Sequence, residues 1–73
     1  MYYKYYLNPD AQNTPRKEHE VHKEGCYYLS KIRYPIYLGE FTNCADALRE
    51  AKRLYPTYTI DGCYHCCLPC HTM

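Results

Sequence analysis

The 73 residues of this chain include six cysteines and four histidines. Those with the spacing of metal ligands fall in two clusters. His22 and Cys26 are separated by three residues, and the second cluster begins with the C-x2-C pair Cys63 and Cys66. A C-x2-C spacing lets two thiolates reach one tetrahedral ion across a tight turn. Because thiolate and imidazole are ligands that Zn²⁺ prefers, the sequence predicts a Cys3His zinc site made of these four residues.

The cysteine-rich end of the chain offers more ligands than one ion needs. Cys67, Cys70 and His71 follow closely on Cys66, and they stay open as alternative ligands. Cys67 and Cys70 also have the C-x2-C spacing of thiol–disulfide exchange proteins, whose reactive cysteine sits at a helix N-terminus that lowers its pKa. We expect no helix after Cys70, so redox chemistry is kept only as an alternative.

Two further residues of these types are expected outside the site. His19 and His22 lie three apart on a predicted strand, where side chains alternate between the two faces. We assign His22 to the metal because it is nearer to Cys26, and we expect His19 to share the face of Val21 or to be exposed. Cys44 falls on the apolar face of a predicted helix, where a thiol behaves as a small apolar side chain.

Three runs of strand-favouring residues must position the site. They cover residues 2–7, 18–22 and 34–41, and the polar stretch 8–17 is interpreted as a flexible loop. We expect the chain to form one small domain over residues 1–73. Its predicted fold is α+β, an antiparallel sheet of about three strands with one helix packed across it and a cysteine-rich C-terminal tail.

The helix is the clearest element in the sequence. Apolar residues recur at 3.6-residue spacing over residues 44–55. Asn43 can cap its start, and Pro56 disfavours helical geometry at the residue before it. After the helix, we interpret Asp61 and Gly62 as a turn.

Composition shows why a metal would matter. Eleven of the aromatic residues are Tyr, one is Phe and none is Trp, so the aliphatic core is thin. Apolar burial at this length only about cancels the cost of ordering the chain, roughly 1.5 kcal/mol per residue. A structural zinc ion contributes about 10–16 kcal/mol of apparent binding energy in small peptides, which is enough to decide folding.

Parts of the chain resemble a group of short bacterial proteins that carry no established activity. The resemblance lies in His22-x3-Cys26, in Leu38-Gly39-Glu40-Phe41, in the helix, and in the ending Asp61-Gly62-Cys63-x2-Cys66-x3-Cys70-His71-Thr72. The order of these features is more remotely similar to the zinc-binding module of the Ada DNA-repair protein and to zinc tails of some nucleases. This resemblance implies a small α+β fold and a zinc ligand role for His22, Cys26, Cys63 and Cys66.

These observations predict a zinc-binding module that is not an enzyme. We expect a protein partner in preference to nucleic acid, because the net charge of +1 gives little attraction to a polyanion. Tyr3, Tyr5 and Tyr28 are candidate contact residues, and the chain is expected to be a monomer or a weak dimer. Alternatives are a single-stranded nucleic-acid-binding zinc module, a thiol redox protein that uses Cys67 and Cys70, and an exported protein stapled by disulfides.

We expect the protein in the cytoplasm. The first residues do not have the apolar stretch of a secretory signal peptide, and no run approaches the roughly 18 apolar residues of a membrane span. Cytosolic thiols stay reduced. The density of cysteine therefore favours metal binding over disulfide bonds, and no membrane partner is predicted.

Overall fold

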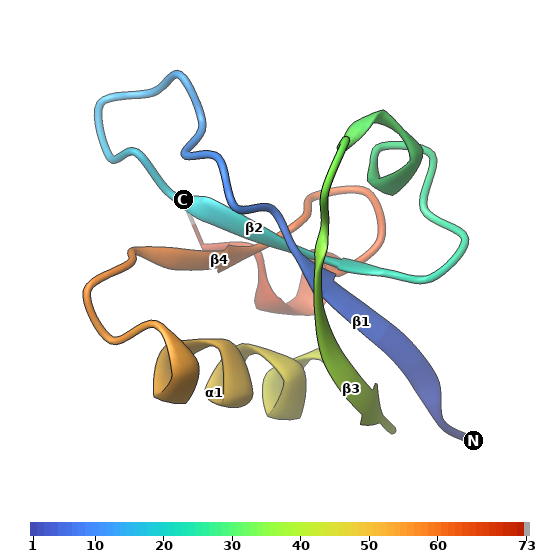
Figure 1. The fold of residues 1–73 in the computed structure, drawn as a ribbon. Coiled ribbons are helices and arrows are strands. Elements are labelled where there is room, and N and C mark those ends of the chain that lie inside the picture. The colour runs from blue at the N-terminus through green and yellow to red at the C-terminus, as the bar shows by residue number, and fades with distance from the viewer. Residues whose placement is uncertain (73) are drawn as a thin grey trace.

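A computed structural model of the chain describes residues 1–72, whose strands form a single four-stranded sheet (Figure 1). The strands are β1 (Tyr3–Leu7), β2 (His19–Lys23), β3 (Ile36–Phe41) and β4 (Ile60–Gly62), in the order β3-β1-β2-β4. β1 pairs antiparallel with both β2 and β3, whereas β2 and β4 run parallel. The α+β class is confirmed, but the sheet is mixed and has one strand more than predicted.

The additional strand lies where a turn was expected. Asp61 and Gly62 belong to β4, which pairs with residues 19–21 of β2. Three residues are too few to show a hydrophobic alternation, so the pattern gave no sign of a strand. A parallel neighbour also requires a crossover connection, which the helix between β3 and β4 supplies.

The predicted helix is confirmed as α1 (Cys44–Leu54). The Asn43 side chain accepts a hydrogen bond from the Asp46 backbone N–H at 2.9 Å, so the expected cap is present. Ala47 and Ala51 are fully buried, and the helix packs along one face of the sheet (Figure 1). These small side chains allow a close approach of helix and strands, which fixes the position of the segment that follows.

The core lies between the helix and the sheet. It includes Tyr5, which was predicted to contact a partner, and Cys67, which was an alternative metal ligand. Tyr5 is 3% exposed within this cluster, so it is corrected from a contact residue to a core residue. Tyr3 is half-buried, with the Lys23 ammonium 4.0 Å from its ring centroid. Val21 is buried on β2 as predicted. Cys67 is also buried in this core.

A disulfide joins Cys44 to Cys70. It connects the first turn of α1 to the 3-10 helix η2 (Leu68–Cys70) near the C-terminus. The prediction that Cys44 is only an apolar side chain is therefore wrong. The pairing depends on how the tail packs against the helix, which no local spacing reports.

The loop between β1 and β2 contains hydrogen bonds of its own. In the loop between β1 and β2, the Gln12 N–H donates to the Glu18 carbonyl at 2.8 Å and the Thr14 hydroxyl donates to the Glu18 carboxylate at 2.8 Å. A second 3-10 helix, η1 (Leu29–Lys31), follows β2. Among the described residues, no helix is both long and apolar enough to cross a membrane.

Candidate metal centre

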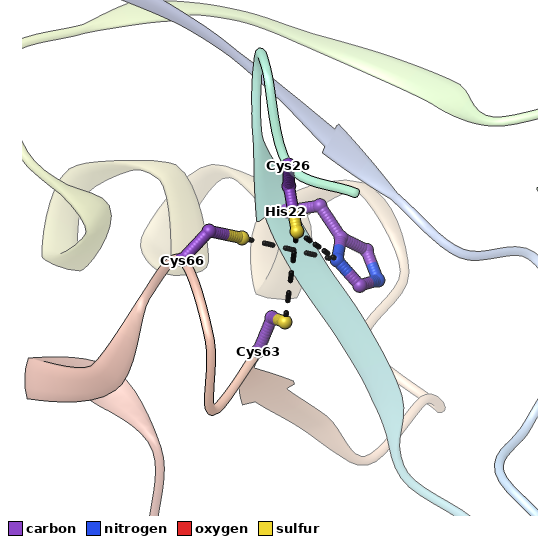
Figure 2. Close-up of side chains that lie close together, drawn as sticks. All are labelled: His22, Cys26, Cys63 and Cys66. Carbon is purple, nitrogen blue, oxygen red and sulfur yellow. Dashed lines mark hydrogen bonds between the residues drawn. The ribbon is translucent and has the colours of Figure 1, made fainter. Parts of the chain in front are cut away.

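Two loops bring the four predicted zinc ligands together. His22 lies near the end of β2, Cys26 in the turn after it, and Cys63 and Cys66 in the loop that follows β4. One ligand atom from each residue lies within 4.8 Å of the other three. Figure 2 shows the three sulfur atoms and the His22 ring turned toward a common centre. The set can hold a metal ion.

The parallel pairing of β2 and β4 creates this meeting point. The Cys63 N–H donates to the Val21 carbonyl at 3.0 Å, so Cys63 lies directly beside His22. Val21 faces the core, and alternation along the strand therefore turns His22 to the other face. Gly25 has φ +86°, a left-handed conformation that suits glycine, and it turns the chain so that Cys26 returns toward His22.

Three separations between ligand atoms are close to those of a tetrahedral metal shell. His22 Nδ1 lies 3.7 Å from Cys26 Sγ and 3.9 Å from Cys66 Sγ. Cys26 Sγ lies 4.0 Å from Cys63 Sγ. With Zn–S near 2.3 Å and Zn–N near 2.0 Å, tetrahedral angles place ligand atoms roughly 3.5–3.8 Å apart. Because all four ligand atoms lie within 4.8 Å of one another, an ion at the centre requires them to move closer by about 1 Å or less.

His22 is held in the chemical form that binds metal. Its side chain is 2% exposed, and burial lowers its pKa to about 4, so the ring is neutral at pH 7. Nδ1 faces the thiols, while Nε2 lies 3.8 Å from a carboxylate oxygen of Glu20. A carboxylate behind a ligating imidazole orients the ring and raises its basicity.

Burial holds the thiols protonated until a cation is present. It raises the pKa of Cys26, and it raises the pKa of Cys63 to about 12. The pKa of Cys66 is also raised, first by its hydrogen bond with Cys67 and then by burial. A divalent ion supplies the positive charge that lets such thiols ionise, since Zn²⁺ binds the thiolate.

Backbone amides oppose this effect and favour the thiolates. Amides of Tyr28 and Leu29 lower the pKa of Cys26, and those of His65 and Cys66 do the same for Cys63. Both cysteines thus receive N–H groups from the residues two and three positions later. The Lys23 N–H lies 3.3 Å from Cys66 Sγ. All three sulfur atoms therefore have donors suited to a negatively charged ligand.

The structure places the alternative ligands elsewhere. Cys70 is bonded to Cys44, and its sulfur is therefore committed. Cys67 is buried beside Cys66, and the hydrogen bond from Cys66 lowers its pKa. His71 Nδ1 lies 3.0 Å from the Asp61 carboxylate and 3.0 Å from the Gly62 carbonyl. None of the three belongs to the cluster of four ligand atoms.

His19 also lies outside the cluster, on the face of β2 that carries Val21. Its ring stacks on Tyr58 with 3.8 Å between centroids, and Nδ1 lies 3.1 Å from the Asn8 carbonyl. The expectation that His19 shares the face of Val21, opposite to His22, agrees with this placement.

Two acidic residues near the site were not singled out from the sequence. Glu20 stands two residues before His22, so alternation alone puts both side chains on one face of β2. Burial, together with the nearby Asp61 charge, raises the Glu20 pKa. Asp61 is 1% exposed and accepts a hydrogen bond from the Thr72 N–H at 2.9 Å. Asp61 therefore fastens the C-terminal segment beside β4, a role that its position in a supposed turn did not suggest.

Comparison with protein-family models, with curated proteins and with solved structures found no match to this chain. The case for function therefore depends on the geometry and chemistry of the centre.

Proposed function

We propose that this protein is a small zinc-binding module in which the ion is structural and the surface contacts another macromolecule. The observation that carries the proposal is the convergence of His22, Cys26, Cys63 and Cys66 within 4.8 Å. Four protein ligands fill a tetrahedral shell, whereas catalytic zinc sites keep one position for water or substrate. The proposal is therefore a stabilising centre and not an enzyme.

The ligand set favours zinc over other common ions. Mg²⁺ and Ca²⁺ prefer oxygen ligands, while three thiolates and one imidazole suit a softer ion in tetrahedral geometry. The more remote resemblance to the Ada zinc module gives a ligand role to the same four positions. We extend the proposal to that relationship only for the metal, because Cys67, Cys70 and His71 have no counterpart there.

Native mass spectrometry with zinc quantification tests the proposal. We expect one zinc ion per chain, loss of the ion in a strong chelator and a large accompanying fall in Tm. His22→Ala and Cys26→Ser should each lose the metal. His65→Ala is the matched control, because His65 is an exposed histidine in the same loop and is not in the cluster. A chain that keeps its Tm in chelator, or that keeps zinc in both ligand variants, would falsify the proposal.

One observation favours part of a second candidate, a disulfide-stabilised protein. Cys44 and Cys70 are bonded, while the other four cysteines are free. A single bridge beside a metal centre differs from a scaffold of three disulfides. Intact mass in the presence and absence of reductant separates the two, because each bridge removes two hydrogens. We expect one bridge, and three bridges without zinc would favour the second candidate.

A further inference from the structure

The loops that carry the metal ligands also carry a group of exposed aromatic rings. Tyr27 and Tyr28 follow Cys26 directly, and Tyr64 and His65 lie between Cys63 and Cys66. Tyr28 and His65 are stacked with 4.5 Å between centroids, which joins the two loops across the centre. Tyr27, Tyr28 and Tyr64 are 65%, 43% and 57% exposed. We call these four residues the ring surface.

A cavity of about 350 Å³ adjoins the ring surface. Tyr28, Tyr64 and His65 contribute to its wall, together with polar side chains from neighbouring elements. These include Gln12, Glu20 and Lys31, and the Gln12 amide donates to the Glu20 carboxylate at 3.3 Å. Aromatic faces, hydrogen-bonding groups and a cation thus meet at one opening, which is the combination a nucleotide requires.

The chain segments that carry the rings differ in charge from the nearly neutral whole chain. Residues 25–39 and 62–72 contain no Asp or Glu, and the first of these segments contributes Lys31 and Arg33. The Lys31 ammonium lies 4.9 Å from the centroid of Tyr27, and the Arg33 guanidinium lies 5.4 Å from the centroid of Tyr34. Cations placed beside exposed rings can contact phosphates while the rings contact bases.

Two acidic side chains, Glu20 and Glu24, also line the cavities beside the rings, and each accepts a hydrogen bond. Glu24 accepts a hydrogen bond from the Lys4 backbone N–H at 2.6 Å, and Glu20 accepts one from Gln12. Lys31 and Arg33 are both exposed, and Lys31 also lines the cavity beside the rings.

We propose that the ring surface binds single-stranded nucleic acid, with bases stacked on Tyr28 and Tyr64 and phosphates beside Lys31 and Arg33. This inference rests on the proposed function, because the metal would hold the two ring-bearing loops in place. A duplex keeps its bases stacked inside and cannot offer their faces to tyrosine. Tyrosines also suit a protein interface, but Lys31 in the wall of the cavity beside the rings favours a ligand that carries phosphates.

Fluorescence anisotropy with a labelled single strand of about 15 nucleotides tests the proposal on the zinc-loaded protein. We expect saturable binding and much weaker binding of the matching duplex. Two phosphate contacts predict a slope of log K against log salt of about −1.4. Lys31→Glu should remove about half of that slope, whereas Lys52→Glu, an exposed lysine on α1, should change it little.

Variants of the rings separate stacking from fold. The double variant Tyr28→Ala with Tyr64→Ala should raise Kd about tenfold or more while zinc content stays at one per chain. Tyr2→Ala is the matched control, because Tyr2 is 67% exposed, precedes β1 and lies outside both loops. Equal losses in the control and the double variant would overturn the proposal.

Zinc content, measured in each sample, distinguishes this inference from the proposed function. Zinc-loaded protein that binds no single strand at low salt overturns the nucleic-acid proposal and leaves the metal centre standing, and the ring surface then becomes a candidate for a protein partner. Protein that carries no zinc fails the proposed function directly. Chelation of loaded protein should abolish strand binding, and unchanged binding would show that the rings do not depend on the metal.

Discussion

At the scale of single residues, the metal centre combines groups that are unfavourable without an ion. His22 is buried and neutral, and burial raises the pKa values of Cys26 and Cys63. Backbone N–H groups point at the same sulfur atoms and favour their charged form. A divalent cation reconciles these opposing demands, because it allows the thiols to ionise and keeps the imidazole unprotonated.

The low pKa of His22 predicts that acid destabilises the fold. The group has a pKa of about 4 when folded, against 6.5 for an ordinary histidine. The unfolded chain thus binds the additional proton between these values, and stability that is present above pH 6.5 is lost as pH falls toward 4. For the metal-free chain the loss is roughly 3 kcal/mol.

Urea unfolding at several pH values measures this effect. Zinc-loaded protein should lose stability more steeply, because protons also compete with the ion for the thiolates. His22→Ala should flatten the profile of the metal-free chain over this range. A wild-type profile that is flat between pH 6.5 and pH 4 contradicts the assignment of His22 as a buried neutral ring.

Glu20 provides a second prediction at this scale. Its carboxylate oxygen lies 3.8 Å from His22 Nε2, and a small approach would let it accept a hydrogen bond from the ring N–H and orient the ring. Glu20→Gln keeps the size of the side chain and removes the charge. We expect zinc affinity to fall about tenfold with the stoichiometry unchanged, measured by competition with a chromophoric chelator. Glu50→Gln, on the exposed side of α1, is the control, and an equal effect there would exclude a specific role for Glu20.

At the scale of elements, the sequence predicted local structure well and pairing poorly. The helix follows from its 3.6-residue periodicity, the three longer strands follow from runs of strand-favouring residues, and the pair His22 and Cys26 follows from its spacing. β4 was missed because its three residues derive their strand geometry from pairing with β2. The Cys44–Cys70 bond was missed for a related reason, since it reflects contact between elements far apart in sequence.

Gly62 shows how closely the tail packs on β4. A Cβ at this position would lie 2.8 Å from the Cys67 carbonyl oxygen and 2.8 Å from Cys70 Cβ. Backbone must therefore move in Gly62→Ala, and we expect a loss of about 1–3 kcal/mol in thermal or urea unfolding. The displaced segment also carries Cys66, so zinc affinity should fall as well.

Gly25→Ala offers a comparison with a different cause. No atom lies within 4 Å of a Cβ there, but its φ of +86° disfavours a side chain, at a cost of about 1–2 kcal/mol. If Gly62→Ala leaves both stability and zinc affinity unchanged, the tail does not pack on β4 as described.

At the scale of the whole molecule, two cross-links of different chemistry would hold one thin core. The proposed ion joins β2 to the loop after β4, while the disulfide joins α1 to η2. Both pass through the cysteine-rich tail, whose Cys67 is buried in the core between them. The tail is therefore a structural part of the domain. Within a few residues it supplies a proposed ligand in Cys66, a core residue in Cys67 and a disulfide partner in Cys70.

Removal of the disulfide tests whether the two cross-links have separate roles. The bond spans 26 residues, and a loop of that length contributes about 3.5 kcal/mol by restricting the unfolded chain. Cys44→Ser with Cys70→Ser should therefore lower Tm while the zinc content stays at one per chain, because neither sulfur belongs to the ligand cluster. Zinc quantification and thermal unfolding on the same sample measure both effects.

The affinity for zinc should respond only through folding. If the metal-free variant is partly unfolded, its apparent affinity falls by the fraction that is folded, because only the folded chain presents the four ligands together. The single variant Cys44→Ser leaves the Cys70 thiol free to bind metal. This variant therefore serves as the control for replacement of a ligand by Cys70. Loss of zinc in the double variant at a temperature where it remains folded would mean that Cys44 or Cys70 is a ligand, and the assignment of the centre to His22, Cys26, Cys63 and Cys66 would then be wrong.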